Sequence, residues 1–403
     1  MKNIIIKINV SHLRKFILLF SVFSLSLVLI FASSWIADTY SSCSAIPVTA
    51  DKNSRVKIRD DGTTLVNGKS FFPFGFYHVS WRATAEKRMK ALQDIAAGGF
   101  NTIHASATKL DNYGEFLDEA ERLGVYVLTE QNVGLSNLVN AFKHKSAVLG
   151  WSIADDVDSG KLTREDILKL HQNAKALDLN HITYVSGYSR KISRFANCSD
   201  ALAIQSYPIR SGTEKELSST YSKVSIAHNA VTKFNQALYA NLQTFSWSFE
   251  NTPENRNARA PKFEEVRNMT YQALLAGAKG IIYYTYYDDD WHLPEYPDLW
   301  VGMKSLVPEM QAISPFLLDG KFKMIDPGRN NLLTGIWVHH NQTLAVIINT
   351  SYNPISEVAI KLPKNVREAR PIFAARGAGL SVKNGQLIGS LNPLAVHLYS
   401  LRN

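Results

Sequence analysis

The feature that most constrains the fold is an alternation of two sequence patterns between residues 71 and 313. Short apolar runs of strand length, such as Val125–Thr129, alternate with segments whose apolar residues recur at helical spacing, such as Tyr113–Leu123. Strands that alternate with helices form a parallel sheet with right-handed crossovers. Eight such units in about 250 residues are the size of one closed barrel. An open doubly wound sheet is disfavoured, because no Gly-x-Gly-x-x-Gly motif follows the first strand.

The sequence therefore predicts an α/β fold, a (β/α)8 TIM barrel over residues 55–319. A hairpin signalled by Asp60–Thr63 precedes the first strand. The eight predicted strands cover residues 71–77, 100–104, 125–129, 147–153, 182–185, 201–204, 237–242 and 280–284.

The pattern changes at about residue 320. Three segments, 343–349, 357–362 and 395–400, alternate or run apolar with turn residues between them, and no helix-length pattern interrupts them. We predict that residues 320–403 form a small C-terminal antiparallel β-sandwich that packs against the barrel.

The first 50 residues have the layout of an export signal. Basic residues through Lys15 precede an apolar run from Phe16 to Ala32, and small residues follow it. We interpret residues 1–37 as a signal peptide or an N-terminal membrane anchor, with a polar linker over 38–54. Either interpretation places the rest of the chain outside the cytoplasm, secreted or attached to the outer face of the cytoplasmic membrane.

Charge and cysteine content exclude several classes of partner. The formal net charge is +9, but four basic residues and only one acidic residue lie in the first 50, and the remainder has no dense basic stripe. Nucleic-acid binding is therefore not expected. Cys43 and Cys198 are the two cysteines, too few for a disulfide framework or a cysteine metal site. We predict no cofactor and no metal; the sequence indicates no oligomeric state.

Polar side chains gather where the predicted strands end, which is the edge that carries the chemistry of (β/α)8 barrels. The candidate catalytic residues are Asp155 and Asp156 after strand four, Glu130 after strand three and Asp288 after strand eight. Cleavage of a glycosidic bond needs one carboxylic acid to protonate the leaving oxygen and a second carboxylate at the oxocarbenium-like centre. Crowded carboxylates have separated pKa values, so that one of them stays protonated near neutral pH.

Aromatic, imidazole and amide side chains surround these acids, as sugar rings and hydroxyls would require. The candidate substrate-binding residues are His78, His104, Tyr207, Gln243, Trp247, Tyr286 and Trp291. Each feature also has a structural interpretation. The acids near Asp155 could begin a solvated loop that caps the helix near Thr163, and Asp288–Asp290 could be a solvated loop. His104 could be a hydrogen-bonded core residue.

The segment Trp151-x-x-x-Asp155-Asp156-Val157 resembles the Trp-x-x-x-Asn/Asp-Glu-Pro motif on strand four of retaining (β/α)8-barrel glycoside hydrolases. The opening segment 61–75 and the segment 267–284 look like the hairpin, helix and strand eight of β-galactosidase-like relatives. This resemblance covers about residues 55–403. It implies a TIM barrel with a C-terminal sandwich, hydrolysis of O-glycosidic bonds in a saccharide, and a general acid at Asp156 with Asp155 as its orienting neighbour.

Three positions depart from the family pattern. Asp156 is one methylene shorter than the expected glutamate, which withdraws the carboxyl by about 1.5 Å. Val157 replaces proline, and strand seven ends in Gln243, whose neutral amide cannot be a nucleophile. A second carboxylate must then come from Glu130 or Asp288, in a retaining or an inverting geometry. The alternative is a catalytically degenerate barrel that binds carbohydrate or acts as a scaffold.

Overall fold

The computed structural model describes residues 55–210, 214, 217–250, 252–326, 328–364, 366–376 and 379–402. The predicted export segment 1–37 and the linker 38–54 lie outside these ranges. Within them, no helix combines the length and the apolar character that crossing a membrane would require.

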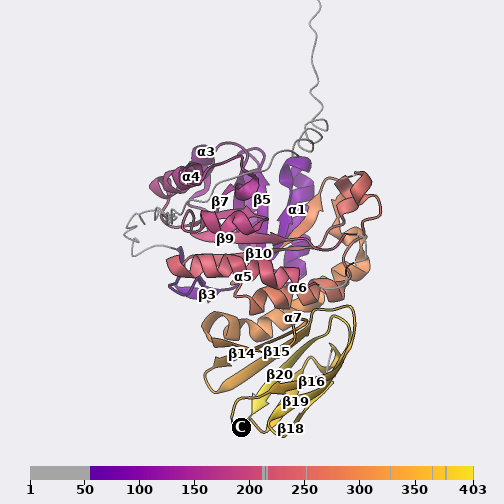
Figure 1. Cartoon of the computed structure of the whole chain (residues 1–403). Helices are drawn as coiled ribbons and strands as arrows, with labels where there is room; N and C mark the ends of the chain where they lie inside the picture. The colour runs from indigo at the N-terminus through magenta and orange to yellow at the C-terminus, as the bar shows by residue number, and fades with distance from the viewer. Residues whose placement is uncertain are drawn as a thin grey trace, which may run out of the picture. The chain divides into compact units, whose positions relative to one another are not determined.

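Eight parallel strands close into a barrel (Figure 1). Neighbouring strands pair in chain order, and the last strand pairs with both its predecessor and the first. The strands are β4 (Phe74–His78), β5 (Thr102–Ala107), β6 (Tyr126–Gln131), β7 (Val148–Ala154), β8 (Ile182–Gly187), β9 (Ala201–Ser206), β10 (Ala237–Gln243) and β11 (Ile281–Asp288). The predicted (β/α)8 barrel is confirmed.

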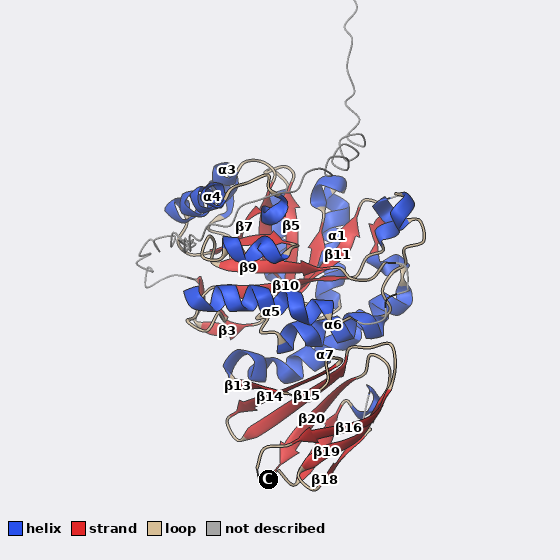
Figure 2. Ribbon diagram, viewed as in Figure 1, coloured by secondary structure: helices blue, strands red, loops and turns tan. Residues whose placement is uncertain are grey.

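Helices follow seven of the eight strands and lie outside the sheet (Figure 2). A 3-10 segment, η4 (Arg190–Phe195), takes the place of a helix between β8 and β9. The helices are α1 (Ala85–Ala97), α2 (Tyr113–Leu123), α3 (Leu135–Phe142), α4 (Arg164–Leu177), α5 (Ser219–Val231), α6 (Phe263–Leu275) and α7 (Pro297–Asp319). Local signals fix their ends: Thr163 and Asp166 form a reciprocal capping box at α4, and Gly124 ends α2 with a left-handed φ of 71°.

A hairpin sheet closes the amino end of the barrel. Its strands are β1 (Val56–Ile58), β2 (Thr64–Val66) and β3 (Lys69–Phe71). Val56 and Val66 pack into the same apolar cluster as the residues that fill the barrel, and the hydroxyls of Thr64 and Tyr239 lie 2.5 Å apart. The Val56 N–H donates to the Asn180 carbonyl (2.9 Å), just before β8 begins. Because this end is plugged, the carboxyl end of the barrel is the one available for chemistry.

Two antiparallel sheets follow the barrel, which confirms the predicted sandwich. The five-stranded sheet has the order β13-β14-β15-β20-β17, and the three-stranded sheet has the order β16-β19-β18. The strands are β13 (Lys321–Ile325), β14 (Leu332–His339), β15 (Gln342–Asn349), β16 (Ile355–Lys361), β17 (Glu368–Ile372), β18 (Leu380–Lys383), β19 (Gln386–Leu391) and β20 (Val396–Arg402). Apolar residues of both sheets form one cluster between them.

Buried polar side chains of α6 and α7 tie the barrel to the sandwich. Arg267 on α6 pairs with Glu309 on α7 (3.0 Å) and donates to the Val396 carbonyl of β20 (2.9 Å). Asn268 donates to the carbonyls of Asn349 and Leu394, at 2.9 Å each. Arg267 and Asn268 therefore both donate to backbone carbonyls across the interface, and Glu309 neutralises the buried charge of Arg267 from the barrel side.

Candidate active site

Five polar side chains on neighbouring strands meet at the carboxyl end of the barrel. They are Ser106 on β5, Glu130 on β6, Asp155 after β7, Ser186 on β8 and Gln205 on β9. Asp155 accepts hydrogen bonds from the Ser186 hydroxyl and from Gln205 Nε2 (3.1 Å). The Ser106 hydroxyl donates to Glu130. We call these five residues the mouth cluster.

The turn after β7 determines which of the two adjacent aspartates faces the mouth cluster. Asp155 Oδ1 accepts the backbone N–H of Asp156 (2.9 Å), and Asp156 has a left-handed φ of 49°. Gln205 Nε2 lies 2.9 Å from Asp156 Oδ1, so one amide bridges both carboxylates. Both aspartates are exposed, but Asp155 has three donors, whereas Asp156 has Gln205 as its donor among the described residues.

The acids of the mouth cluster have pKa values near neutrality. Burial, opposed by the hydrogen bond from Ser106 and helped by the charge of Asp155, raises the pKa of Glu130 to about 7. Burial and the neighbouring Asp156 charge raise the pKa of Asp155 to about 6, against its three hydrogen bonds. The Asp155 side chain is accessible to solvent at the barrel mouth, but protein surrounds it, so its charge is only partly hydrated.

Asp156 and Asp158 have different environments. Burial raises the pKa of Asp156, and the Asp158 charge adds to this, while Gln205 and Lys161 oppose it. Asp158 is buried and accepts the Ser189 N–H and hydroxyl, both at 2.6 Å, so it fixes the start of η4. We considered that these aspartates could form a loop that caps the helix near Thr163. That helix, α4, is capped by Thr163 and Asp166, so Asp155 has no capping role; Asp158 caps the neighbouring segment η4 instead.

Four tyrosines surround Asp155, from β4, β8, the end of β9 and β11. Burial raises the pKa of Tyr77, Tyr184, Tyr207 and Tyr284, and the Asp155 charge adds to each shift. Inside the barrel, the hydroxyls of Tyr77 and Tyr184 lie 3.1 Å apart. Because the Asp155 charge acts on all four hydroxyls, these tyrosines lie in the neighbourhood of Asp155.

An aromatic wall stands beside the mouth cluster. The Tyr207 ring lies 5.6 Å from Tyr284, 5.2 Å from Phe245 and 6.3 Å from Trp247, centroid to centroid. Arg210 lies over the Trp247 ring at 4.3 Å. The predicted ligands Tyr207 and Trp247 are therefore brought together near Asp155, and both keep part of their surface accessible.

Asp288 contacts Tyr284, the tyrosine of β11 that also lies near Asp155. The Tyr284 hydroxyl donates to Asp288 Oδ2 (2.6 Å), and the charges of Asp288 and Asp155 both raise the pKa of Tyr284. Burial raises the pKa of Asp288, although Arg82 is 3.6 Å away. Asp288 is only 4% exposed, so the solvated-loop interpretation does not describe this residue.

Three predicted substrate-binding residues have contacts that are structural. Gln243 is fully buried; its amide accepts the Ile209 N–H (2.8 Å) and donates to the carbonyls of Ile209 (2.7 Å) and Phe245 (2.9 Å). Tyr286 is buried and donates to Asp94 on α1 (2.8 Å), and Trp291 stacks on Tyr296 at 4.1 Å. A substrate role for these three stays a prediction.

The two predicted histidines are buried and neutral. His104 stacks on Tyr77 at 3.8 Å, and burial lowers its pKa to about 3. Neither of its ring nitrogens has a hydrogen-bond partner among the described residues, so it is a core histidine but not a hydrogen-bonded one. His78 ends β4 and faces a separate cavity. No group of three or more His, Cys, Asp or Glu side chains in the described part of the chain is arranged to hold a metal ion.

Sequence reasoning missed Ser186; it expected Ser106 and Gln205 at the strand ends around the mouth but gave neither of them a role toward the acids. Small serines give no distinctive signal in a sequence. Their position at strand ends was the available indication, because inward positions alternate along each strand.

Comparison with solved structures gives the same architecture. A family 5 glycoside hydrolase from Bacteroides vulgatus superposes with a TM-score of 0.62 at 13% identity, covering 87% of this chain and 94% of that one. The α-amylase of Geobacillus thermoleovorans, solved with acarbose, gives 0.56 at 11% identity, covering 86% and 99%. A family 30 endoxylanase from Clostridium papyrosolvens gives 0.52 at 11%, covering 87% and 100%. No protein-family model matches the sequence, and no curated protein does. The chain therefore shares the (β/α)8 barrel fold of these solved structures.

Proposed function

We propose that this chain is a glycoside hydrolase in which Glu130 and Asp155 carry out the acid/base chemistry. The observation that carries the proposal is that two carboxyls, Glu130 on β6 and Asp155 just after the neighbouring strand β7, lie close enough for the Asp155 charge to raise the pKa of Glu130, and that their pKa values are raised to about 7 and about 6. Glycosidic cleavage needs one protonated and one ionised carboxyl at the same time, and these two values allow that near neutral pH.

The hydrogen bonds support a different role for each carboxyl. Asp155 accepts from Ser186, Gln205 and the N–H of Asp156, and donors of this kind stabilise the ionised form. Glu130 has a single donor among the described residues, Ser106, and the higher pKa. Glu130 is therefore the proton donor to the leaving oxygen, and Asp155 is the carboxylate that faces the anomeric carbon or activates water.

This assignment changes the roles expected from sequence, which gave the proton to Asp156. Asp156 binds Gln205 at the exposed edge and acts on Asp155 through repulsion and through its backbone N–H. Tyr207, Trp247 and Tyr284 supply the rings on which a sugar packs. We further propose, from the N-terminal sequence, that the enzyme works outside the cytoplasm on a saccharide.

The test is turnover of a panel of aryl glycosides by Glu130→Gln and Asp155→Asn. Removal of one acid/base group costs about 10²–10⁴ in rate. Glu130→Gln should therefore lose kcat by that factor with leaving groups that need protonation, and much less with activated nitrophenolates. Glu115→Gln, at an exposed position on α2, is the matched control and should keep wild-type kcat. Wild-type turnover in both acid variants would refute the assignment.

A sugar-binding protein without turnover is the second candidate, and Gln243 favours it. Strand seven of the family ends in a nucleophile, whereas here a buried amide holds the Ile209 backbone. If this candidate is correct, no glycoside in the panel is hydrolysed by the wild type. Saccharide binding, measured by calorimetry, should then survive in Asp155→Asn and fall in Trp247→Ala.

A further inference from the structure

A short segment of the sandwich contacts the part of the barrel rim that carries the aromatic wall. The loop between β9 and α5 carries Tyr207, and the loop between β10 and α6 carries Trp247. The sandwich segment consists of residues 350–352, directly after β15. Its Thr350 carbonyl accepts the N–H of Leu217 (2.8 Å), which lies at the end of the first loop, just before α5. The sandwich therefore contacts one of the two loops directly.

Tyr352 in the same segment contacts a buried ion pair at the start of α6. Its hydroxyl donates to Glu265 Oε1 (2.5 Å). Glu265 is 1% exposed, and both of its oxygens accept from the Arg259 guanidinium, at 2.6 and 2.7 Å. Burial acts to raise the pKa of Glu265, but the hydrogen bonds from Arg259 and Tyr352 outweigh burial and hold that pKa below its usual range. A bidentate contact between two charged groups is strong and fixes their orientation.

Arg259 connects this ion pair to the aromatic wall. Its backbone N–H donates to the Arg210 carbonyl (2.8 Å), and its guanidinium lies 3.7 Å from Glu214 Oε2. Glu214 Oε1 accepts the Arg210 N–H (2.6 Å), so both backbone polar groups of Arg210 are held. The Arg210 guanidinium lies over the Trp247 ring at 4.3 Å. Each step from the sandwich to the Trp247 ring is therefore a direct contact.

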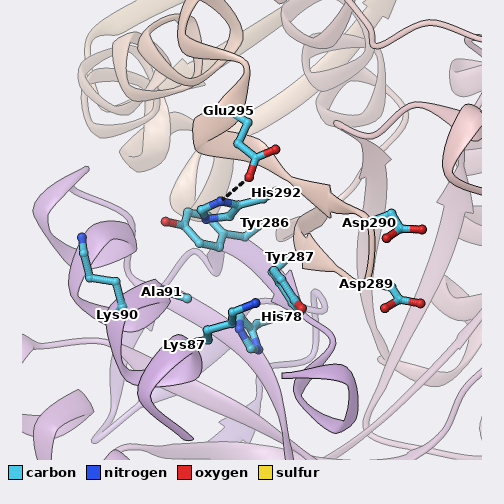
Figure 3. A pocket seen from close by; sticks show the side chains of 10 residues that line it. All are labelled: His78, Lys87, Lys90, Ala91, Tyr286, Tyr287, Asp289, Asp290, His292 and Glu295. Carbon is cyan, nitrogen blue, oxygen red and sulfur yellow. Dashed lines mark ion pairs between the residues drawn. The ribbon is translucent and has the colours of Figure 1, made fainter. Parts of the chain in front are cut away.

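Another part of the rim is built from barrel residues. A cavity of about 280 Å³ lies there, between α1 and the hairpin of β11 and β12 (Trp291–His292), and the side chains drawn around it all belong to the barrel (Figure 3). The ion pairs near this cavity are also internal to the barrel: His292 pairs with Glu295 (3.4 Å), and Arg82 with Asp289 (3.1 Å). The contact with the sandwich thus concerns the side of the mouth where the aromatic wall stands.

We propose that Tyr352 is a positioning residue for the substrate, so that the sandwich supports the active site without touching the saccharide. Through Glu265 and Arg259 it holds the loops that carry the aromatic wall. Groups that bind a substrate need neighbours that lock their position, and a shift of about 1 Å is enough to weaken their action. This role rests on the proposed function, because that function assigns the aromatic wall to the sugar.

The experiment measures KM and kcat with the panel of aryl glycosides, on the full chain. The variants are Tyr352→Phe, Trp247→Ala and the double variant that carries both. Tyr271→Phe is the matched control, because the Tyr271 hydroxyl also donates to a buried carboxylate near the sandwich, Glu309 (2.7 Å), which pairs with Arg267. For a saccharide that binds without turnover, the Kd from calorimetry replaces KM.

Tyr352→Phe should raise KM about threefold or more and leave kcat unchanged, because it weakens binding of the ground state and the transition state alike. In the Trp247→Ala background the same substitution should leave KM unchanged, since the ring through which Tyr352 acts is then absent. Tyr271→Phe should keep the wild-type KM.

Three results would each overturn the role of Tyr352. They are a wild-type KM in Tyr352→Phe, an equal effect of that substitution with and without Trp247, and an equal rise of KM in Tyr271→Phe. If Glu130→Gln and Asp155→Asn keep wild-type turnover while Tyr352→Phe raises KM, the acid/base assignment fails and the role of Tyr352 stands. If the wild type neither hydrolyses nor binds any saccharide, both proposals fail.

Discussion

Replacing Glu130 with glutamine should stabilise the fold in a pH-dependent way. The pKa of this carboxyl is raised from about 4.5 to about 7, so the folded state holds a proton that the unfolded chain releases. Such a group has no effect on stability below about pH 4.5; its cost grows as the pH rises from 4.5 to 7 and stays constant above 7. The rise in pKa from about 4.5 to about 7 corresponds to at most about 3.5 kcal/mol at pH 8, at about 1.4 kcal/mol per pKa unit. Glutamine cannot ionise, and it still accepts the Ser106 hydrogen bond.

The assay is urea unfolding, followed by tryptophan fluorescence, at several pH values between 4.5 and 8.5. Glu130→Gln and wild type should have nearly equal free energies of unfolding at pH 4.5. The variant should gain about 2–3 kcal/mol over wild type by pH 8, with most of the gain between pH 5 and 7. Glu115→Gln, the exposed control, should differ from wild type by a pH-independent amount within about 0.5 kcal/mol.

A variant that is less stable than wild type at pH 8 would refute this reasoning. So would a stability difference that is the same at every pH, because it would mean that Glu130 ionises normally in the fold. A gain in stability together with lost turnover would instead be the trade-off expected of a strained catalytic carboxyl.

Three further outcomes follow from buried contacts. Ser186→Ala removes a donor to Asp155, so the pKa of Asp155 should rise above 6 and the acidic limb of the pH–rate profile should move to higher pH. Asp178→Ala removes a buried acceptor of three hydrogen bonds and should cost about 3 kcal/mol in urea unfolding at pH 7. Because those contacts lower the pKa of Asp178, that cost should shrink as the pH falls below 4. Glu309→Ala leaves Arg267 buried without its counter-ion and should cost about 3–5 kcal/mol, visible as a lower Tm in calorimetry.

Much of the fold could be predicted because its signals are local. The helix Tyr113–Leu123 was bounded correctly, since helical spacing and Gly124 are both readable in the sequence. The first barrel strand was predicted over 71–77, whereas β4 covers Phe74–His78 and Phe71 belongs to the hairpin strand β3. Two strands that follow each other without a long loop give one apolar run, and Pro73 was the only sign of the break.

The site was less predictable because it depends on where each side chain points and on contacts between residues that are far apart in the sequence. Their places at the ends of predicted strands put Glu130 and Asp155 at the mouth, but the left-handed turn at Asp156 decides which aspartate faces the mouth cluster, and adjacency in sequence cannot show that. Gln243 occupies the expected nucleophile position, yet Ile209, remote in sequence, takes up its amide. The raised pKa values of Glu130 and Asp155 could not be predicted either, because they depend on burial by several strands that come together only in the fold.

The position of β20 has a consequence for how the chain is made. This strand lies between β15 and β17, so the five-stranded sheet stays in two pieces until residues 396–402 have been synthesised. The carbonyls of Leu394 and Val396, which receive donors from α6, also arrive only then. A nascent chain that has already completed its eight-stranded barrel therefore carries Arg267 and Asn268 without these acceptors. A chain that terminates just before β20 should therefore have a barrel with exposed polar donors and a sheet in which β15 and β17 lack their shared partner strand. Chaperones and proteases should recognise such a chain.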